Sequence, residues 1–169
     1  MRQVRLIVLA ATALLALGIT AAATAMRPGP VEDGTLSLRD GRATVQLRMK
    51  GGILGRMGRG KVTVTEPVSD PGTVVIRGAR ARVVNARTTV YTGKSIRFRI
   101  SADERFTVRI NGTKINFSAV GRGDGWIDGW GNPDAGVYFD GSFSLNGDAY
   151  KSIPDLRTPI RLEAPPTEG

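Results

Sequence analysis

Hydrophobic and polar residues alternate with a period of two along most of the chain beyond residue 33. The clearest stretch is RFTVRINGTKINFSAV, in which single polar residues separate Phe106, Val108 and Ile110. Side chains of a β-strand point alternately to its two faces, so this pattern indicates strands with one buried face. No window shows the 3.6-residue apolar spacing of an amphipathic helix. The pattern therefore predicts an all-β domain over residues 34–162.

Dipeptides that favour tight turns divide this pattern into short strands. Asn111-Gly112 and Asp40-Gly41 each favour a two-residue type I′ turn, so each is predicted to join the strands of a hairpin. The first hairpin would bring Arg109 opposite Lys114. Asn146-Gly147 is a third turn signal. Further strands are predicted at residues 61–65, 72–77, 80–84, 88–91, 95–100, 136–139 and 142–145.

The number of strands indicates the architecture. About ten short strands with closely spaced turns are typical of an antiparallel β-sandwich or barrel, which is the predicted fold. A β-solenoid is the alternative, because GTLSLRDGRATV and GTVVIRGARARVV are loosely similar. No fixed repeat period emerges, so the solenoid takes second place.

The N-terminal segment lacks the alternation. Arg2 and Arg5 precede the uncharged apolar run 6–25, which ends with the small-residue spacing of Ala23 and Ala25 that a signal peptidase reads. Residues 1–25 are therefore predicted to be a hydrophobic helix that acts as a signal peptide or, if it is retained, as a membrane anchor. Residues 26–33 would be a linker and 163–169 a disordered tail. Both alternatives place the β domain outside the cytoplasm, either secreted or tethered.

The amino-acid composition limits which catalytic and metal-binding sites the chain can form. The chain of 169 residues has 24 Lys and Arg against 15 Asp and Glu, a net charge of +9, and contains neither cysteine nor histidine. Disulfides, thiolate or imidazole metal sites and Ser-His-Asp or Cys-His catalysis are therefore excluded. We expect a protein that is not an enzyme and that needs no cofactor.

The positive charges suggest a binding surface. In the predicted strand 95–100, Arg97 and Arg99 point away from the apolar side chains between and beside them. The candidate anion-binding residues are Arg80, Arg82, Arg97, Arg99, Arg109 and Lys114. Their partner would be an anionic envelope polymer or an acidic membrane surface, because no motif for sequence-specific nucleic-acid recognition accompanies the charge. The alternative is a solvated sheet face whose charges prevent edge-to-edge aggregation.

A second candidate site lies in the stretch 121–141. Its aromatic rings and carboxylates resemble those of a sugar-binding groove, and its candidate residues are Trp126, Trp130, Tyr138, Asp124 and Asp128. A suitably spaced pair of carboxylates could also hydrolyse a glycosidic bond. The aspartate spacing does not match the helical calcium loop, so no metal is expected. The alternative is that the tryptophans anchor the core while the aspartates stabilise turns.

GRMGRGKVTV, residues 55–64, matches most of a phosphate-binding loop. Such a loop needs Ser or Thr after the lysine and a helix that begins there. This chain has Val62 at that position, and the alternation that follows predicts a strand. We therefore expect no nucleotide site.

Three short motifs are similar to a group of exported all-β bacterial proteins. They are VGRG at 120–123, SLNG at 144–147 and IPDL at 153–156, and they resemble the closing half of that group. The resemblance implies the fold and export, and no activity. The sequence thus predicts an exported, non-enzymatic binding or structural module of the cell envelope, with glycan binding or self-assembly as alternatives.

Overall fold

A computed structural model describes residues 33–66, 72–131 and 140–164. All strands belong to one antiparallel sheet that is not closed, and no helix occurs in these ranges. The all-β prediction is therefore confirmed. The predicted N-terminal helix, residues 26–32 of the linker, the strand 136–139 and residues 165–169 of the tail lie outside the described residues. The strands are β1 (Gly34–Thr65), β2 (Thr73–Asn85), β3 (Thr88–Gly129), β4 (Ser142–Leu145), β5 (Lys151–Ser152) and β6 (Thr158–Leu162).

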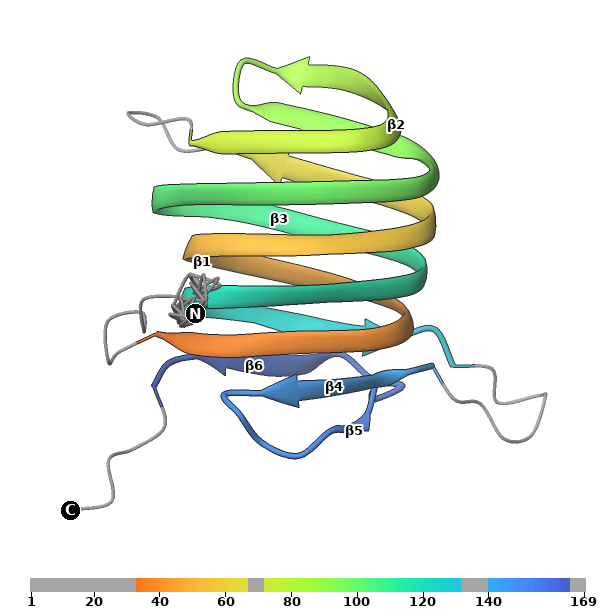
Figure 1. Cartoon of the computed structure of the whole chain (residues 1–169), viewed down its shortest axis with the longest axis vertical. Coiled ribbons are helices and arrows are strands. Elements are labelled where there is room, and N and C mark those ends of the chain that lie inside the picture. Colours follow the sequence, from red (N-terminus) through yellow and green to blue (C-terminus); the bar gives the residue numbers. More distant parts are fainter. Residues whose placement is uncertain (1–32, 67–71, 132–139, 165–169) are drawn as a thin grey trace, which may run out of the picture.

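The long strands β1 and β3 wind around one axis as an open coil (Figure 1). Val45 of β1 pairs on its two sides with Ile110 and with Ile127, which both belong to β3. Val62 likewise pairs with both Tyr91 and Ile110 of β3. The stretches from Tyr91 to Ile110 and from Ile110 to Ile127 are therefore successive turns of β3, and β1 runs between them. The winding resembles the solenoid alternative, and its open sheet is not the closed barrel.

The coil is flattened, so that two walls face each other across the core, as the sheets of a sandwich do (Figure 1). The same long strands run through both walls. The first wall consists of residues 35–39, 52–57, 73–77, 96–101 and 115–120. The second wall consists of residues 43–49, 61–65, 79–85, 88–92, 106–111 and 123–129.

Glycines stack where the strands turn from one wall to the other. Gly51 pairs with Gly121, and Gly60 pairs with both Gly93 and Gly112. Gly51 has a φ of +120°, and a Cβ there would collide with the carbonyl oxygen of Val120. Strands can therefore pass closely over one another at these corners because no side chain stands between them.

Two predicted hairpins are wrong for the same reason. Asn111 and Gly112 lie within β3 and pair with β1 on both sides, and Asp40 and Gly41 lie within β1. Asp40 does adopt a positive φ of 49°, which bends the strand at a corner instead of reversing it. Long-range pairing with two neighbouring turns satisfies more backbone groups than a local hairpin, and so overrides the turn signal.

The chain reverses direction at other positions. The β2–β3 hairpin turns after Asn85, whose Oδ1 accepts hydrogen bonds from the N–H groups of Arg87 at 3.0 Å and Thr88 at 2.9 Å. The third turn signal is confirmed, because Asn146 and Gly147 form a turn with φ values of 52° and 86°. The predicted strand 142–145 coincides with β4, and 61–65 is the last part of β1.

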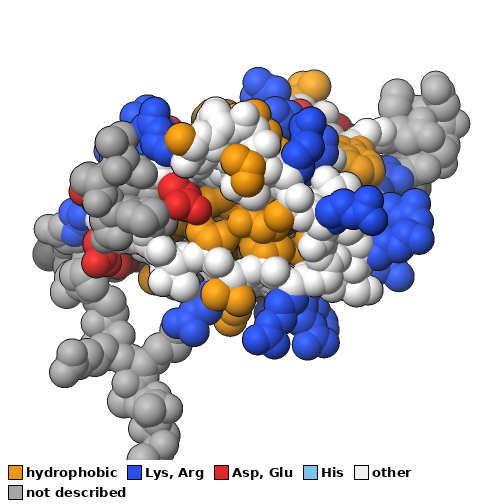
Figure 2. Space-filling model, turned by 90° about the horizontal axis from the view of Figure 1, so that it is seen from above, with side chains coloured by type: hydrophobic (Ala, Val, Ile, Leu, Met, Phe, Trp, Pro, Cys, Tyr) orange, Lys and Arg blue, Asp and Glu red, His pale blue; other side chains and the backbone are white. Residues whose placement is uncertain are grey.

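The core is covered at one end of the coil only. At the closed end, β4, β5, β6 and their connections add the buried side chains of Phe143, Ile153, Ile160 and Leu162. At the open end, β2 is the last strand of the sheet, and among the described residues it pairs only with β3. In the view from above onto the open end, apolar side chains show at the centre of the molecule. Lys and Arg side chains lie around much of the rim, and acidic side chains lie on one side (Figure 2).

Candidate anion-binding groove

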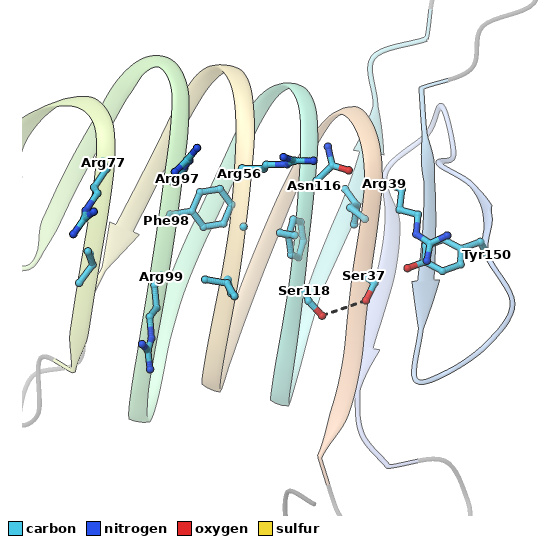
Figure 3. Close-up of a pocket in the computed structure, with 15 residues that line it drawn as sticks. Ser37, Arg39, Arg56, Arg77, Arg97, Phe98, Arg99, Asn116, Ser118 and Tyr150 are labelled. Atoms are coloured by element: carbon cyan, nitrogen blue, oxygen red, sulfur yellow. Dashed lines mark hydrogen bonds between the residues drawn. The ribbon is translucent and has the colours of Figure 1, made fainter. Parts of the chain in front are cut away.

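A shallow groove of about 630 Å³ runs across the outer face of the first wall (Figure 3). Its floor is strand backbone at positions such as Gly55 and Phe98, where the Phe98 side chain is buried in the core. Its rim consists of side chains that point outward from different turns of the coil. We call it the basic groove and define it by Arg39, Arg56, Arg77, Arg97, Arg99, Leu54, Val75 and Tyr150.

Three arginines form a row across neighbouring strands. Arg97 of β3 pairs with Arg77 of β2 on one side and with Arg56 of β1 on the other. Neighbouring strands lie about 4.8 Å apart, so the three side chains share one face in close succession. Figure 3 shows them following one another, with Asn116 next in the same direction. The row crosses the strands and therefore runs along the axis of the coil.

A second row lies two residues away from the first on each strand and contains one arginine between two apolar side chains. Arg99 pairs with Val75 on one side and Leu54 on the other. Leu54 is 65% exposed and Val75 44% exposed, although both are aliphatic. Beyond Leu54, the hydroxyl groups of Ser118 and Ser37 are 3.3 Å apart and hydrogen-bonded. The groove thus offers both positive charge and accessible apolar surface.

The groove ends at an aromatic side chain near the closed end. The guanidinium of Arg39 lies 3.9 Å from the centre of the Tyr150 ring. This cation–π contact orients Arg39 while leaving its donors free to face solvent or a ligand. Arg39 is the fifth arginine of the groove.

No acidic side chain lines the basic groove among the described residues. Ion pairs of the described ranges lie elsewhere, such as those between Arg42 and Asp140, Arg122 and Asp33, and Arg161 and Glu163. Like charges on neighbouring strands repel each other. The five arginines therefore form a positive surface on one wall, and Asp40 borders a neighbouring hollow with Arg56 and Arg97.

The six predicted cations are divided between the two walls. Arg97 and Arg99 lie in the basic groove. Arg109 lies further along β3, on the second wall, and borders a hollow there with Arg82. Arg80 pairs with Thr92 on that same wall. The six residues therefore do not form one face.

Lys114 does not lie opposite Arg109, which pairs with Gln46 and Thr63 instead. The predicted opposition required the hairpin at Asn111-Gly112, and that hairpin does not exist. Lys114 takes a left-handed φ of 52° at a corner and borders a smaller hollow with Arg56 and Arg97. It lies beside the basic groove without lining it.

Sequence reasoning missed Arg39, Arg56 and Arg77. Arg77 follows the outward-pointing Val75 in a predicted strand, so its orientation was readable from alternation. Arg56 lies in the glycine-rich stretch, where no strand was predicted. Alternation places Arg39 on the face opposite Leu38, but in a supposed hairpin and not beside Arg97. Their proximity to Arg97 depends on the pitch of the coil, for which the sequence carries no visible repeat.

The predicted glycan-binding residues are spread over one end of β3. Trp126 is half-buried on the second wall, and the guanidinium groups of Arg157 and Arg109 lie 4.1 Å and 5.5 Å from its ring centre. Trp130 is 44% exposed just beyond the strand. A ring in contact with two cations is less open to stacking on a sugar. Tyr138 lies outside the described residues.

The neighbouring aspartates have separate surroundings. Asp124 is exposed and pairs across strands with Arg161, whereas Asp128 is half-buried opposite Thr44. Asp140 is buried, and its carboxylate accepts hydrogen bonds from Arg42 Nε at 2.8 Å and the Gly131 N–H at 2.7 Å. Within the described ranges, no three acidic side chains come close enough to hold a metal ion.

The phosphate-loop stretch is entirely strand. Residues 55–64 lie inside β1 and turn a corner at Gly60, so no helix begins after Lys61. The predicted strand after the lysine is confirmed. Its backbone N–H groups are not gathered at a helix N-terminus, as phosphate binding by such a loop requires.

Comparisons with protein families, with curated proteins and with solved structures find no match to this chain. The described residues include no helix that is long and apolar enough to cross a membrane. The molecule is thus defined by its own features, an open antiparallel β-coil with an arginine-lined groove on one wall. Function must be argued from that site, because a fold alone does not imply one.

Proposed function

We propose that this chain is an exported, non-enzymatic binding module that holds an anionic polymer of the cell envelope in the basic groove. The observation that carries the proposal is the set of five groove arginines with no acidic residue among the lining side chains. A guanidinium group presents a planar set of donors that matches a carboxylate or a phosphate in bidentate fashion. Several such groups on one face favour a ligand with repeated negative charges.

The direction of the arginine row suggests how the polymer lies. Arg77, Arg97 and Arg56 succeed one another from strand to strand, so a chain of anionic groups would cross the strands along the coil axis. It would continue towards Arg39 and Tyr150 at the closed end. Bound anions would relieve the repulsion between arginines on neighbouring strands. The exposed Leu54 and Val75 would contact apolar faces of the polymer.

Location and chemistry are consistent with this role. The basic, apolar N-terminal segment 1–25 supports export, which would bring the domain to polymers outside the cytoplasm. The absence of histidine and cysteine from the whole chain removes the commonest proton-transfer and nucleophilic groups. Binding is therefore a better use of this surface than catalysis.

The test compares two variants that lose the same charge. One carries Arg56→Gln and Arg97→Gln in the basic groove, and the other carries Arg80→Gln and Arg82→Gln on the second wall. Each protein is sedimented with polygalacturonate, a polymer with one carboxylate per sugar, at low and high salt. We expect the parent to bind at low salt and to lose binding at high salt, because exposed ion contacts are screened.

The groove variant should bind at least about tenfold more weakly than the parent, which corresponds to about 1.4 kcal/mol. The second-wall variant should stay close to the parent. Equal losses in both variants would mean that net charge alone attracts the polymer, and the groove would have no special role. Thermal unfolding of both variants checks that they are folded.

A further inference from the structure

The open end of the coil carries an edge strand that is long enough to receive another strand. β2 has 13 residues and follows the rim through both walls, and in the described part of the chain it pairs with β3 on one side only (Figure 1). At an edge strand, alternate N–H and C=O groups point away from the sheet without a sheet partner. Such groups are a template for strand addition by an extended peptide.

The core at this end also has an incomplete cover. Val74, Ile76 and Ala79 of β2 point inward and pack against the core, yet each keeps intermediate exposure. Figure 2 shows apolar side chains at the centre of this end. One more strand beside β2 would bury them further, and hydrophobic burial favours association in proportion to the area removed from water.

The charge of the rim indicates what kind of strand fits. β2 carries Arg77, Arg80 and Arg82, all exposed, and contains no Asp or Glu. A second copy that paired through its own β2 would bring two such sets of arginines onto neighbouring strands, where like charges are destabilising. Self-pairing is therefore disfavoured, whereas an acidic strand would place its carboxylates beside the arginines.

We propose that the β2 edge binds an extended segment of another protein in which apolar and acidic residues alternate. Its apolar side chains face the open core, because successive side chains of a strand point to opposite faces. Its carboxylates lie on the outer side beside Arg80 and Arg82, which are two residues apart on the second wall. Main-chain hydrogen bonds supply affinity and the alternation supplies specificity. This site is separate from the proposed polymer contact in the basic groove, which includes Arg77 of β2 but neither Arg80 nor Arg82.

The probe is a short fluorescent peptide of alternating Glu and Val, with a Lys and Val peptide of the same length as its charge-reversed control. Anisotropy with the full chain should show binding of the acidic peptide only. In the variant with Arg80→Glu and Arg82→Glu, the acidic peptide should bind at least about tenfold more weakly. The Lys and Val peptide should then bind in its place. Failure of this exchange would overturn the proposal.

Two further measurements separate strand addition from simple charge attraction. N-methylation of every second peptide amide removes the hydrogen-bond donors along one edge of the peptide strand. Methylation of the amides that face β2 should abolish binding, whereas methylation of the other set of amides should preserve it. If neither set of N-methyl groups weakens peptide binding, the β2 edge does not accept a strand and the proposal is wrong. The groove variant with Arg56→Gln and Arg97→Gln should bind the peptide like the parent. If the protein alone doubles in mass in sedimentation and excludes the peptide, a second copy occupies the edge and the proposal fails.

Discussion

The two ends of the coil differ in how the end of the core and the last strand edge are covered. In a coiled sheet that is not closed, the first and the last turn each expose a strand edge and the core beneath it. At the closed end, β4, β5 and β6 place Phe143, Ile153, Ile160 and Leu162 over the core. At the open end, the rim strand β2 carries arginines instead of a cap. One end is sealed by packing, whereas the other is protected by charge and stays available for binding.

The largest difference between the ends should appear when a capping side chain is shortened. Ile160 of β6 is 5% exposed and lies in the strand that pairs with β3. Ile160→Ala removes buried methyl groups and leaves a cavity, so we expect a loss of about 2–5 kcal/mol in the free energy of unfolding. Denaturant unfolding measures this loss. A loss below about 1 kcal/mol would mean that the closed end is not sealed by packing.

The buried ion pair of the closed end should give the next largest effect. The Asp140 side chain is 1% exposed and accepts from Arg42 and the Gly131 N–H. Asp140→Ala removes the acceptor of both hydrogen bonds, and we expect a loss of about 1–3 kcal/mol in the free energy of unfolding. Glu163→Ala is the control, since its pair with Arg161 is exposed and should contribute less than about 1 kcal/mol. Equal effects of the two substitutions would contradict a structural role for Asp140.

Much of the fold was predictable from alternation alone. Residues 142–145 form β4, residues 61–65 are strand, and Phe106, Val108 and Ile110 are buried together. Alternation reports which side of a strand meets the core, and that local property survives any change of partner. Asn146-Gly147 does form a turn, whereas Asn111-Gly112 does not, because it pairs on both sides with distant turns of β1. Of the two dipeptides Asp40-Gly41 and Asn111-Gly112, only Asp40 takes a positive φ, of 49°, and it bends the strand at a corner instead of reversing it.

The candidate site was only partly predictable for a related reason. Alternation identified Arg97 and Arg99 as outward-facing, and both line the basic groove. Their neighbours Arg56 and Arg77 come from other turns, and the length of each turn of the coil decides which residues meet. The same winding moved Arg109 to the second wall. The direction in which a strand side chain points can thus be predicted from its neighbours in the sequence. Which side chains come together on one face depends on the long-range register of the strands.

A matched substitution at the open end sharpens the comparison with Ile160. Ile76 of β2 is also an isoleucine that packs against the core, but it remains partly exposed. Ile76→Ala removes side-chain area that is only partly withdrawn from water, so we expect a smaller loss of about 1–2 kcal/mol. The measurement is the same unfolding titration. A loss equal to that of Ile160→Ala would show that both ends are equally covered.

The smallest effect is expected at the far rim of the open end. Val83 of β2 is 71% exposed and lies just before the hairpin turn at Asn85. Val83→Thr keeps a β-branched side chain in the strand while removing apolar surface, so the free energy of unfolding should change by no more than about 0.5 kcal/mol. A larger loss would mean that something in the free protein already covers this rim. The open end would then resemble the closed one, and the contrast between a packed cap and a charged edge would fail.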